Sequence, residues 1–508
     1  MVVFYKADYK RKMNDLLGDK NTYKVLRNDP TNTLQKKNNK LINELHRSKI
    51  ISTTQKFKMN SSAAIAPRLY GLPKIHKPDL PLRPIASSFN VPCYNLSKFI
   101  VNALNDLTSE KYNIKNSYDL KDRLNNININ DDEILVSFDV VSIFTNISTY
   151  LATKIIMNKF GSIQEKLNIS RNTFHKILDF CLKENNYFMY EGKIFTQTYG
   201  MPMGNPLSPT IADIVMDDLL EYTTLELKNV HNIDIKFIVK YVDDIFAVVR
   251  RTDGDIILKT LNEYHNKLKC TVEKEENLSI PFLDVKLHRE ANKIILNWYS
   301  KLISSGRIIN FLSAHPLKYK INTARNFVQK ILTISHHKFK EANIQKIHKI
   351  LKSNNFPSQL INNLIEDTLM SINNKHIKQT TTNTDTDNNK FFSVTYIPKL
   401  TEKFNRDLDN KKHKITLAYK PNCTLSSVFT KTKSPVELQE QNNVVYEIRC
   451  NGKENEQCNK VYIGTTKRPL GVRLSEHEAD IRKKKDNTAL SQHILNSGHE
   501  TDIKTPKY

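Results

Sequence analysis

Hydrophobic and polar positions divide the chain into a helical start, a strand-rich centre and a further helical segment. Apolar residues at helical spacing predict helices near residues 8–17 and 33–45. Spacings of three and four also predict helices in the basic stretch 316–372. Two β-rich apolar runs, residues 134–141 and 237–249, predict strands, and acidic residues interrupt both. The chain therefore combines predicted helices with predicted strands.

The polar stretch at residues 373–390 has low complexity and no apolar pattern, so we expect a flexible linker there. At roughly 150 residues per domain, 508 residues suggest about three domains. Residues 1–6 resemble a strand entered midway, and we expect the natural protein to begin further upstream. The expected parts are a lead-in (1–60), a strand-rich core (61–300), a helical segment (301–372), the linker (373–390), a connector (391–440) and a basic C-terminal unit (441–508).

The net charge of the chain indicates which kind of molecule it binds. The chain has 77 Lys and Arg against 53 Asp and Glu, a formal net charge of +24, which favours nucleic acid as the partner. Asn, Lys and Ile are abundant, and AT-rich codons offer a rival explanation for part of this charge. No apolar run reaches the ~18 residues of a membrane span, and the start lacks a signal-peptide pattern. Six scattered cysteines exclude a disulfide framework, so we expect an intracellular, nuclear protein without a membrane partner.

Three carboxylates stand out because they interrupt apolar strands. Asp139 lies in the first β-rich run, and Asp243 and Asp244 join two apolar strands as the tip of an expected hairpin. A charge in a buried strand normally pairs or binds a metal. Carboxylates from two adjacent strands can hold two Mg²⁺ ions about 4 Å apart, which activate a 3′-hydroxyl and stabilise pyrophosphate. For the Asp243–Asp244 pair alone, an ordinary acidic turn explains the pattern equally well.

Two further segments bear on this alternative. Residues 199–209 (YGMPMGNPLSP) combine three prolines with Gly200 and Gly204, in a chain that has only 12 glycines. Such a loop lets the backbone approach a nucleotide closely, although a plain turn is the simpler alternative. Residues 69–85 (LYGLPKIHKPDLPLRPI) predict a Pro-stiffened hairpin that carries Lys74, Lys77 and Arg83. These cations suit a triphosphate, whereas the alternative is a solvated basic loop.

With these segments in this order, the chain resembles the reverse transcriptases of Penelope-like retroelements. The strings that carry the resemblance are LYGLPKIHKP…PLRPIASS, SFDVVSIFTNI, YGMPMGNPLSPTIADI, YVDDIFAVV, IPFLDVKLHR and GRIINFLSAHPLKYK, which cover about residues 1–375. The resemblance implies an α+β fold, a right-hand polymerase with fingers and palm in residues 61–300 and a helical thumb in residues 301–372. One departure is residues 299–303 (YSKLI), where related sequences tend to have a YRKPT-like string.

The resemblance also implies roles for individual residues. Asp139, Asp243 and Asp244 would bind two Mg²⁺ ions, and Lys74 and Arg83 would contact the incoming dNTP. Phe144 matches the aromatic residue that excludes a ribose 2′-hydroxyl, although a core aromatic is an equal alternative. The residues matched to the loop and to the polar position before it are Gly200, Gly204 and Gln197. The implied partners are an RNA template and a DNA primer or target.

The C-terminal unit offers a second set of polar residues. Strand-like segments around Tyr446 and Tyr462 precede an expected helix, on which Arg473 and His477 share a face at i and i+4. Arg can stabilise a phosphoryl transition state, and Tyr or His can transfer protons. For Arg473 and His477 alone, a basic amphipathic helix is the better interpretation. The whole pattern resembles a GIY-YIG endonuclease, in which Gly464 follows the second tyrosine and Val444–Val445 replace the first Gly-Ile.

That resemblance requires a metal-binding glutamate on a helix well downstream. Only 508 − 473 = 35 residues follow Arg473, and we expect no such helix among them. Glu500 lies too early in the pattern to take this role. We therefore expect a truncated, incomplete α+β nuclease domain that binds nucleic acid and does not cleave it.

Two cysteines and two histidines form a candidate metal set in the same unit. Cys450 and Cys458 flank the turn between the strand-like segments, and His493 and His499 follow. Tetrahedral zinc takes such ligands, but by spacing alone two free cysteines and two surface histidines are the better interpretation. The resemblance puts the zinc interpretation on a level with that alternative, because nucleases of this retroelement group carry such a set.

Three functions follow from the sequence. The first is an RNA-directed DNA polymerase that extends a DNA 3′ end by two-metal nucleotidyl transfer. The second is a decayed element copy that only binds nucleic acid, and the third is a host-adopted, telomere-related polymerase. The intact Asp139, Asp243 and Asp244 favour the first.

Overall fold

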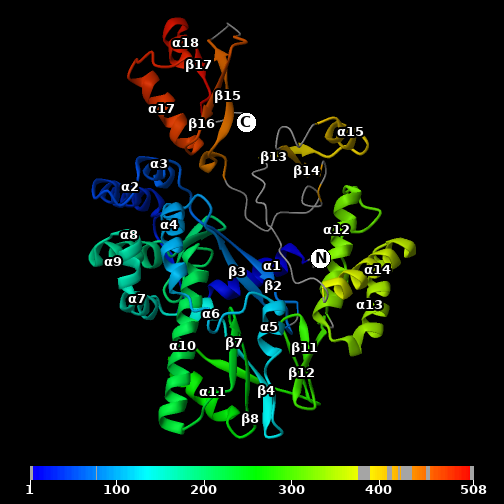
Figure 1. The fold of residues 1–508 in the computed structure, drawn as a ribbon. Helices are drawn as coiled ribbons and strands as arrows, with labels where there is room; N and C mark the ends of the chain where they lie inside the picture. The colour runs from blue at the N-terminus through cyan, green and yellow to red at the C-terminus, as the bar shows by residue number, and fades with distance from the viewer. Residues whose placement is uncertain are drawn as a thin grey trace. The chain divides into compact units, whose positions relative to one another are not determined.

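The computed structural model describes residues 4–75, 77–301, 303–375, 390–408, 415–421, 424, 437–453 and 458–503. The fold mixes α-helices and β-sheets, as expected (Figure 1). The chain divides into two units. Unit 1 contains Met1–Thr108, Ser142–Val215 and Thr432–Tyr508, and unit 2 contains Ser109–Val141 and Met216–Lys431.

Unit 1 is built on a sheet with the strand order β1-β6-β5-β2-β3. Its strands are β1 (Tyr23–Leu26), β2 (Arg68–Pro73), β3 (Leu82–Ser87), β5 (Tyr187–Tyr190) and β6 (Lys193–Gln197). Met13, Leu69 and Phe188 belong to the core that joins α1 (Lys6–Leu17) to this sheet. The expected Pro-stiffened hairpin is confirmed, because β2 and β3 pair antiparallel from Arg68–Ser87 to Pro73–Leu82.

The segments of unit 1 that precede and follow β2 and β3 in sequence are mainly helical. They are α2 (Thr31–Arg47), α3 (Thr53–Met59), α4 (Tyr94–Leu104), α6 (Ile143–Asn146), α7 (Thr149–Asn158), α8 (Phe160–Leu167) and α9 (Arg171–Asp179). Both helices predicted near the N-terminus are present as α1 and α2. The strand expected at residues 1–6 is wrong where it is described, because Phe4 and Tyr5 are irregular and a helix begins at Lys6.

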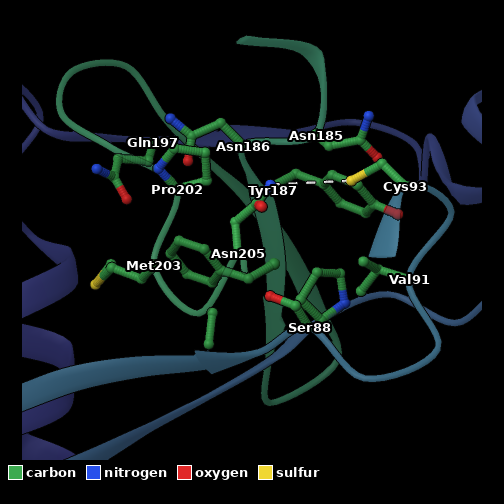
Figure 2. A pocket seen from close by; sticks show the side chains of 13 residues that line it. Ser88, Val91, Cys93, Asn185, Asn186, Tyr187, Gln197, Pro202, Met203 and Asn205 are labelled. Carbon is green, nitrogen blue, oxygen red and sulfur yellow. Dashed lines mark hydrogen bonds between the residues drawn. The ribbon is translucent and has the colours of Figure 1, made fainter. Parts of the chain in front are cut away.

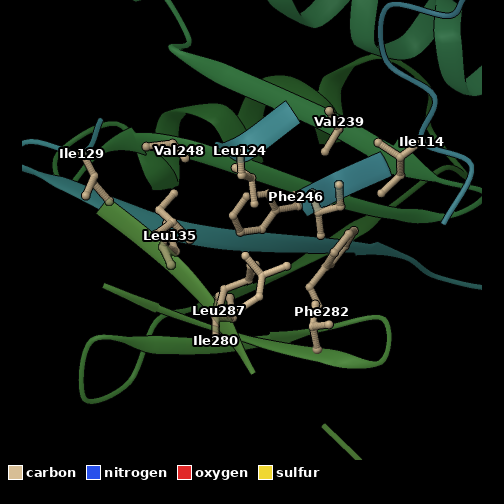
Figure 3. Packing of buried hydrophobic residues seen from close by; sticks show 14 of the residues in the cluster. Ile114, Leu124, Ile129, Leu135, Val239, Phe246, Val248, Ile280, Phe282 and Leu287 are labelled. Carbon is tan, nitrogen blue, oxygen red and sulfur yellow. The ribbon is translucent and has the colours of Figure 1, made fainter. Parts of the chain in front are cut away.

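Unit 2 contains an antiparallel sheet with the order β7-β8-β4-β9. The strands are β4 (Glu133–Val140), β7 (Phe237–Tyr241), β8 (Asp244–Arg250) and β9 (Cys270–Lys274), and a second sheet comprises β10 (Ser279–Phe282), β11 (Val285–Glu290) and β12 (Lys293–Trp298). Leu135 and Phe246 from the first sheet pack against Ile280 and Leu287 from the second (Figure 3). Leu124 joins this core from α5 (Ser117–Leu124). Both predicted β-rich runs are therefore strands.

Two helices lie between strands of this first sheet in sequence. α10 (Leu207–His231) begins at the end of the Gly-Pro loop (residues 199–209) and precedes β7, and α11 (Gly254–Glu263) lies between β8 and β9. The helical segment predicted beyond residue 316 consists of α12 (Leu317–Ile334), α13 (Lys340–Ser353) and α14 (Ser358–Lys375). These last helices share a core of their own, and Trp298 of β12 packs against both this core and the sheet core.

The segments beyond α14 form two smaller structures. In the expected connector, β13 (Lys390–Thr395) pairs parallel with β14 (Ile415–Lys420), and α15 (Leu400–Asp407) lies between them in sequence. The C-terminal module contains β15 (Val444–Gly452), β16 (Val461–Thr466), α17 (Leu470–Arg482), α18 (Ala489–Ser497) and β17 (Glu500–Thr501). Most of the predicted linker, residues 376–389, lies outside the described residues. Among the helices that are described, none is both long and apolar enough to cross a membrane.

Candidate functional site

Strand pairing in unit 2 brings the three predicted carboxylates together. Asp139 near the end of β4 is the antiparallel partner of Asp244 at the start of β8, and Asp243 immediately precedes Asp244. Asp139 is exposed although its strand neighbours Phe138 and Val140 are buried. The Asp139 carboxylate therefore lies on the solvent-accessible side of β4, and the burial of its neighbours does not desolvate it.

Electrostatics in this cluster favour a bound cation. Burial, followed by the neighbouring carboxylates Asp243 and Asp139, raises the pKa of Asp244 to about 6, and Lys301 opposes this shift. Three carboxylates that repel one another are typical ligands for a divalent cation, which would relieve the repulsion. The residues present therefore fit the predicted Mg²⁺ centre.

The turn that carries Asp243 has an unusual backbone. Tyr241 and Asp244 pair across the β7–β8 hairpin, which leaves Val242 and Asp243 as the two turn residues. Val242 has φ +58°, in the left-handed region that glycine prefers at this place in a tight hairpin turn. A β-branched residue there is strained, and such strain persists only where surrounding contacts hold it.

The Gly-Pro loop in unit 1 is shaped by close backbone contacts. A Cβ atom on Gly204 (φ +77°) would lie 1.8 Å from the carbonyl oxygen of Ala86, and one on Gly200 (φ +90°) would lie 2.7 Å from that of Thr145. Gln197 is buried, and its Nε2 donates to the carbonyl oxygens of Tyr199 at 2.7 Å and Met201 at 3.1 Å. The two glycines and the glutamine thus fix the path of the loop.

Further contacts anchor the loop to its surroundings. The Met201 N–H donates to the carbonyl oxygen of Phe144 at 2.7 Å, which ties the loop to α6. The Asn205 side chain accepts from the Leu207 N–H at 3.0 Å and so helps to start α10. Asn205 also lines a small pocket beneath the loop and lies 4.0 Å from the Cys93 sulfur (Figure 2). Phe144 is half-buried, which disfavours the core-aromatic alternative.

Replacing Gly204 by alanine should destabilise the protein and impair the loop. The added Cβ cannot coexist with the Ala86 carbonyl oxygen, so we expect a loss of about 3 kcal/mol in the free energy of unfolding, measured by denaturant titration. Gly192→Ala is the matched control, because Gly192 has a similar φ of +74° but open space around its Cβ position. If both substitutions cost the same ~1 kcal/mol, the close approach at Gly204 has no energetic weight.

The predicted triphosphate contacts lie on the β2–β3 hairpin of unit 1. Lys74 directly follows β2, where its N–H donates to the carbonyl oxygen of Pro81 at 2.9 Å, and Arg83 on β3 is exposed. The hairpin therefore carries both residues, with Arg83 exposed and Lys74 half-buried. Their contact with a nucleotide stays a prediction.

In the C-terminal module, all four predicted polar residues gather around one hydroxyl group. The Tyr446 hydroxyl lies 2.8 Å from His477 Nε2 and accepts from Arg473 Nε at 3.3 Å. The Tyr462 ring packs edge-on against His477 at 5.2 Å. Gly464 pairs with Tyr446, and a Cβ there would lie 2.4 Å from the Tyr446 ring, which explains why glycine stands at this position.

Glu476 is a member of this cluster that the sequence did not indicate. Its carboxylate accepts from Arg468 at 2.6 Å and from Arg473 at 3.0 Å, and these arginines, Arg468 first, lower the pKa of Glu476. The i, i+3 spacing from Arg473 was available as a signal, but charged pairs at this spacing are common on helix surfaces.

Acid should destabilise this module through His477. The imidazole is fully buried, and burial followed by the nearby Arg473 lowers its pKa to about 4. An unfolded histidine titrates near 6.5, so the unfolded state takes up the proton first and stability falls as pH drops from about 6.5 to 4. We expect a loss of about 2–3 kcal/mol in the wild type. Urea titrations across this pH range should show a shallower dependence for His477→Gln, and equal slopes would contradict the assignment.

The candidate metal ligands also converge in the C-terminal module. One ligand atom from each of Cys450, Cys458, His493 and His499 lies within 4.8 Å of all the others. Cys450 Sγ is 3.3 Å from His493 Nε2 and 3.4 Å from His499 Nδ1, and Cys458 Sγ is 3.7 Å from His493 Nε2. Zinc bonds of about 2.3 Å to sulfur and 2.0–2.1 Å to nitrogen imply sulfur–nitrogen edges of roughly 3.6 Å. The four residues thus fit a tetrahedral zinc ion.

A helix that the sequence did not indicate follows α17. It is α18, which spans Ala489–Ser497, where Thr488 supplies an N-terminal cap and Gly498 (φ +68°) ends it. This helix contributes His493 to the cysteine–histidine cluster, and its sequence contains no glutamate. Glu500 lies in β17 and is exposed.

Comparisons with protein families identify two segments of the chain. Residues 75–276 match the family Reverse transcriptase (RNA-dependent DNA polymerase). Residues 307–366, which include α12 and α13, match the family Animal helix-turn-helix domain, a match that the sequence reasoning did not anticipate. No curated protein matches the chain. The chain therefore carries a reverse transcriptase domain that contains Asp139, Asp243 and Asp244.

Solved polymerase structures show weaker similarity. A telomerase from Candida albicans in complex with a TWJ fragment of telomeric RNA is 12% identical, with a TM-score of 0.43, over 72% of this chain and 68% of that chain. A truncated apo telomerase from Candida tropicalis is 14% identical, with a TM-score of 0.34, over 45% of this chain and 54% of that chain. The BmCPV RNA-dependent RNA polymerase at the elongation state is 13% identical, with a TM-score of 0.37, over 68% of this chain and 30% of that chain.

Proposed function

We propose that this chain is the RNA-directed DNA polymerase of a Penelope-like retroelement, which acts in the nucleus and extends a DNA 3′ end on an RNA template. The observation that carries the proposal is the pairing of Asp139 with Asp244 beside Asp243, inside the segment that matches reverse transcriptases. Burial and then repulsion from Asp243 and Asp139 raise the pKa of Asp244, and a divalent metal at this centre would relieve that repulsion.

In this mechanism the chain's own residues hold and select the reactants. Asp139, Asp243 and Asp244 would hold two Mg²⁺ ions. When bound, these ions supply activation of the 3′-hydroxyl and charge stabilisation of the leaving pyrophosphate. Lys74 and Arg83 would bind the triphosphate, since an ammonium and a guanidinium both donate to phosphate oxygens. The loop around Gly200 and Gly204, held by Gln197, would approach the base pair with its backbone.

Primer extension by the full chain tests the polymerase assignment. With a DNA primer on an RNA template, Mg²⁺ and dNTPs, the wild type should add nucleotides, and EDTA should stop the reaction. Binding of the primer–template without incorporation would overturn the proposal and leave a nucleic-acid-binding protein.

Sugar selection gives a second, independent prediction. If the half-buried Phe144 ring excludes a 2′-hydroxyl by its bulk, Phe144→Ala should reduce the dNTP-over-rNTP preference in kcat/KM about 10-fold or more. Phe57→Ala, which removes an aromatic residue that is 74% exposed on α3, is the control and should leave the preference unchanged. An unchanged preference in Phe144→Ala would mean that the ring does not contact the sugar.

For the C-terminal module we propose a GIY-YIG-like fold that contains a structural zinc and binds nucleic acid without cutting it. The hydrogen-bonded cluster of Tyr446, Arg473 and His477 supports the fold assignment, while α18 supplies no glutamate for a catalytic metal and Glu476 pairs with Arg473. The test is nicking of supercoiled DNA in Mg²⁺. Cleavage that Arg473→Ala abolishes would show that the module is an active nuclease after all.

A further inference from the structure

Lys240 on β7 is a lysine with no exposed surface, three residues before Asp243. Lysine is almost never fully buried unless it is paired. Its ammonium group lies 3.2 Å from a carboxylate oxygen of Asp217, which is only 2% exposed, and donates to Asn113 Oδ1 at 2.6 Å. Lys240 and Asp217 therefore form a buried ion pair between β7 and α10 within unit 2.

The backbone around Lys240 is held as firmly as its side chain. The Lys240 N–H donates to the carbonyl oxygen of Tyr112 at 2.8 Å, and its carbonyl oxygen accepts from the Ile114 N–H at 3.0 Å. Because β7 is the outer strand of its sheet, these bonds fix an edge that the sheet itself leaves unpaired. Asp217 also accepts from the Ser109 N–H at 2.7 Å, so one carboxylate orders both the lysine and the segment that clamps it.

The same segment is secured from its far side. Arg123 on α5 donates to the carbonyl oxygens of Asn113 at 2.6 Å and Lys111 at 2.9 Å, and its Nε donates to Asp119 at 3.1 Å. The end of β7 is therefore enclosed by hydrogen bonds immediately before the turn. The turn itself needs such support, because Val242 adopts φ +58° and would relax if β7 were free to shift.

Stability alone does not account for a buried ion pair at this place. Desolvation largely cancels the attraction of such pairs, and apolar replacements are often neutral or stabilising. What an ion pair with several hydrogen bonds adds is a fixed geometry, since each donor and acceptor has a defined direction. Lys301, not Lys240, is the cation that opposes the raised pKa of Asp244. Lys240 is connected to the turn through the backbone of β7, which leads directly into Val242.

We propose that the Lys240–Asp217 ion pair is a positioning device for nucleotidyl transfer, which fixes β7 on α10 and holds the strained Val242–Asp243 turn where it presents its carboxylates. Lys240 and Asp217 are positioning residues, because they are expected to touch neither metal nor nucleotide. The inference rests on the proposed role of Asp139, Asp243 and Asp244. It predicts that removing the pair harms chemistry even when the fold is retained.

The decisive variant replaces both partners at once. Lys240→Met with Asp217→Leu removes both charges without leaving either one buried alone, so folding should be preserved. We expect kcat for primer extension to fall at least 10-fold, since displacement of catalytic groups by about 1 Å can cost 10²-fold. KM for dNTP should change less than 3-fold, and the Mg²⁺ concentration for half-maximal rate should rise. Lys240→Arg, which retains the charge, should recover kcat to within about 3-fold of wild type.

A second buried pair in the same unit provides a matched control. Arg289 and Glu275 form an ion pair at 2.8 Å with side chains 8% and 7% exposed, away from the turn. Arg289→Met with Glu275→Gln, which keeps an acceptor for the Leu135 N–H, should leave kcat and the Mg²⁺ requirement unchanged. A structural role for both pairs would instead lower the two kcat values equally, and that result would overturn the proposal.

The remaining outcomes separate the inference from the function on which it rests. If the Met/Leu variant keeps wild-type kcat and Mg²⁺ dependence within 2-fold, the inference is wrong while the polymerase assignment stands. If the wild type itself shows no Mg²⁺-dependent extension, the proposed function fails first. Should the Met/Leu variant not fold, Lys240→Gln with Asp217→Asn, which retains hydrogen-bonding atoms, is judged by the same kcat and Mg²⁺ criteria.

Discussion

Primer extension should fall by roughly 10³-fold in Asp243→Asn, with little change in folding. Each metal contact in such a centre is worth several kcal/mol of transition-state stabilisation, and about 4 kcal/mol corresponds to 10³-fold in rate. Asparagine has nearly the same shape as aspartate, but it lacks the charge that attracts a divalent cation. Because Asp243 contributes to the raised pKa of Asp244, its removal should relieve repulsion, and the melting temperature should stay constant or rise.

The opposite signs of these two effects make the experiment informative. Replacing a residue that matters only for folding lowers the activity and the melting temperature together. Replacing a metal ligand lowers the activity alone. Asp255→Asn is the control, since Asp255 is a 78% exposed acid on α11 that pairs with Lys274, and its rate should stay within 2-fold of wild type. Extension by Asp243→Asn at more than a tenth of the wild-type rate would remove Asp243 from the metal centre.

The sequence predicted the strands of this centre because its signals are local. Apolar runs around Asp139 and on both sides of Asp243–Asp244 indicated strands and a hairpin, and β4, β7 and β8 confirm them. The pairing of Asp139 with Asp244 depends on strand register, which the runs themselves do not encode. Residue roles at the centre stay predictions, although the geometry of the carboxylates fits them.

The sequence did not predict which polar residues pair over long separations in the chain. No local sequence signal singles out Lys240 on β7, and its partner Asp217 belongs to α10, 23 positions earlier. Nothing in either local pattern indicates that both side chains are buried, because burial of charge is decided by what the rest of the fold packs around it. The strand expected at residues 1–6 failed for a related reason, since a few apolar residues at a chain start fit a strand and a helix entry equally.

In the C-terminal module, spacing and structure gave different answers for the same residues. The seven-residue gap between Cys450 and Cys458 is looser than a zinc knuckle, so spacing favoured free cysteines. The structure closes this gap through the β15–β16 hairpin, and the unforeseen α18 brings His493 to the same place. A metal set assembled from a hairpin and a distant helix has no fixed sequence spacing, so spacing alone does not reveal it.

Removing zinc should unfold the C-terminal module and leave the reverse transcriptase domain intact. The module's core is small, with Tyr446, Ile448, Leu470, Leu474, Leu490 and Ile503 as its buried apolar residues. A unit of this size is marginal without a staple, and structural zinc supplies apparent binding free energies of about 10–16 kcal/mol in small domains. Purified full-length protein should contain one zinc per chain. Cys450→Ser should lose it and expose residues 437–503 to protease.

The comparison variant distinguishes metal loss from simple loss of a buried thiol. Cys270→Ser changes a buried cysteine on β9, outside the cluster, and should retain both the zinc and the protease resistance of the module. Chelation of the wild type should reproduce the Cys450→Ser cleavage pattern, and readdition of zinc should reverse it, because the ligands and not the serine cause the effect. Primer extension in Mg²⁺ should persist in both Cys450→Ser and Cys270→Ser. The reason is that the carboxylate centre lies in unit 2 and the zinc ligands do not. A wild-type protein without zinc, or a Cys450→Ser variant as protease-resistant as wild type, would leave the four side chains as an unmetallated cluster.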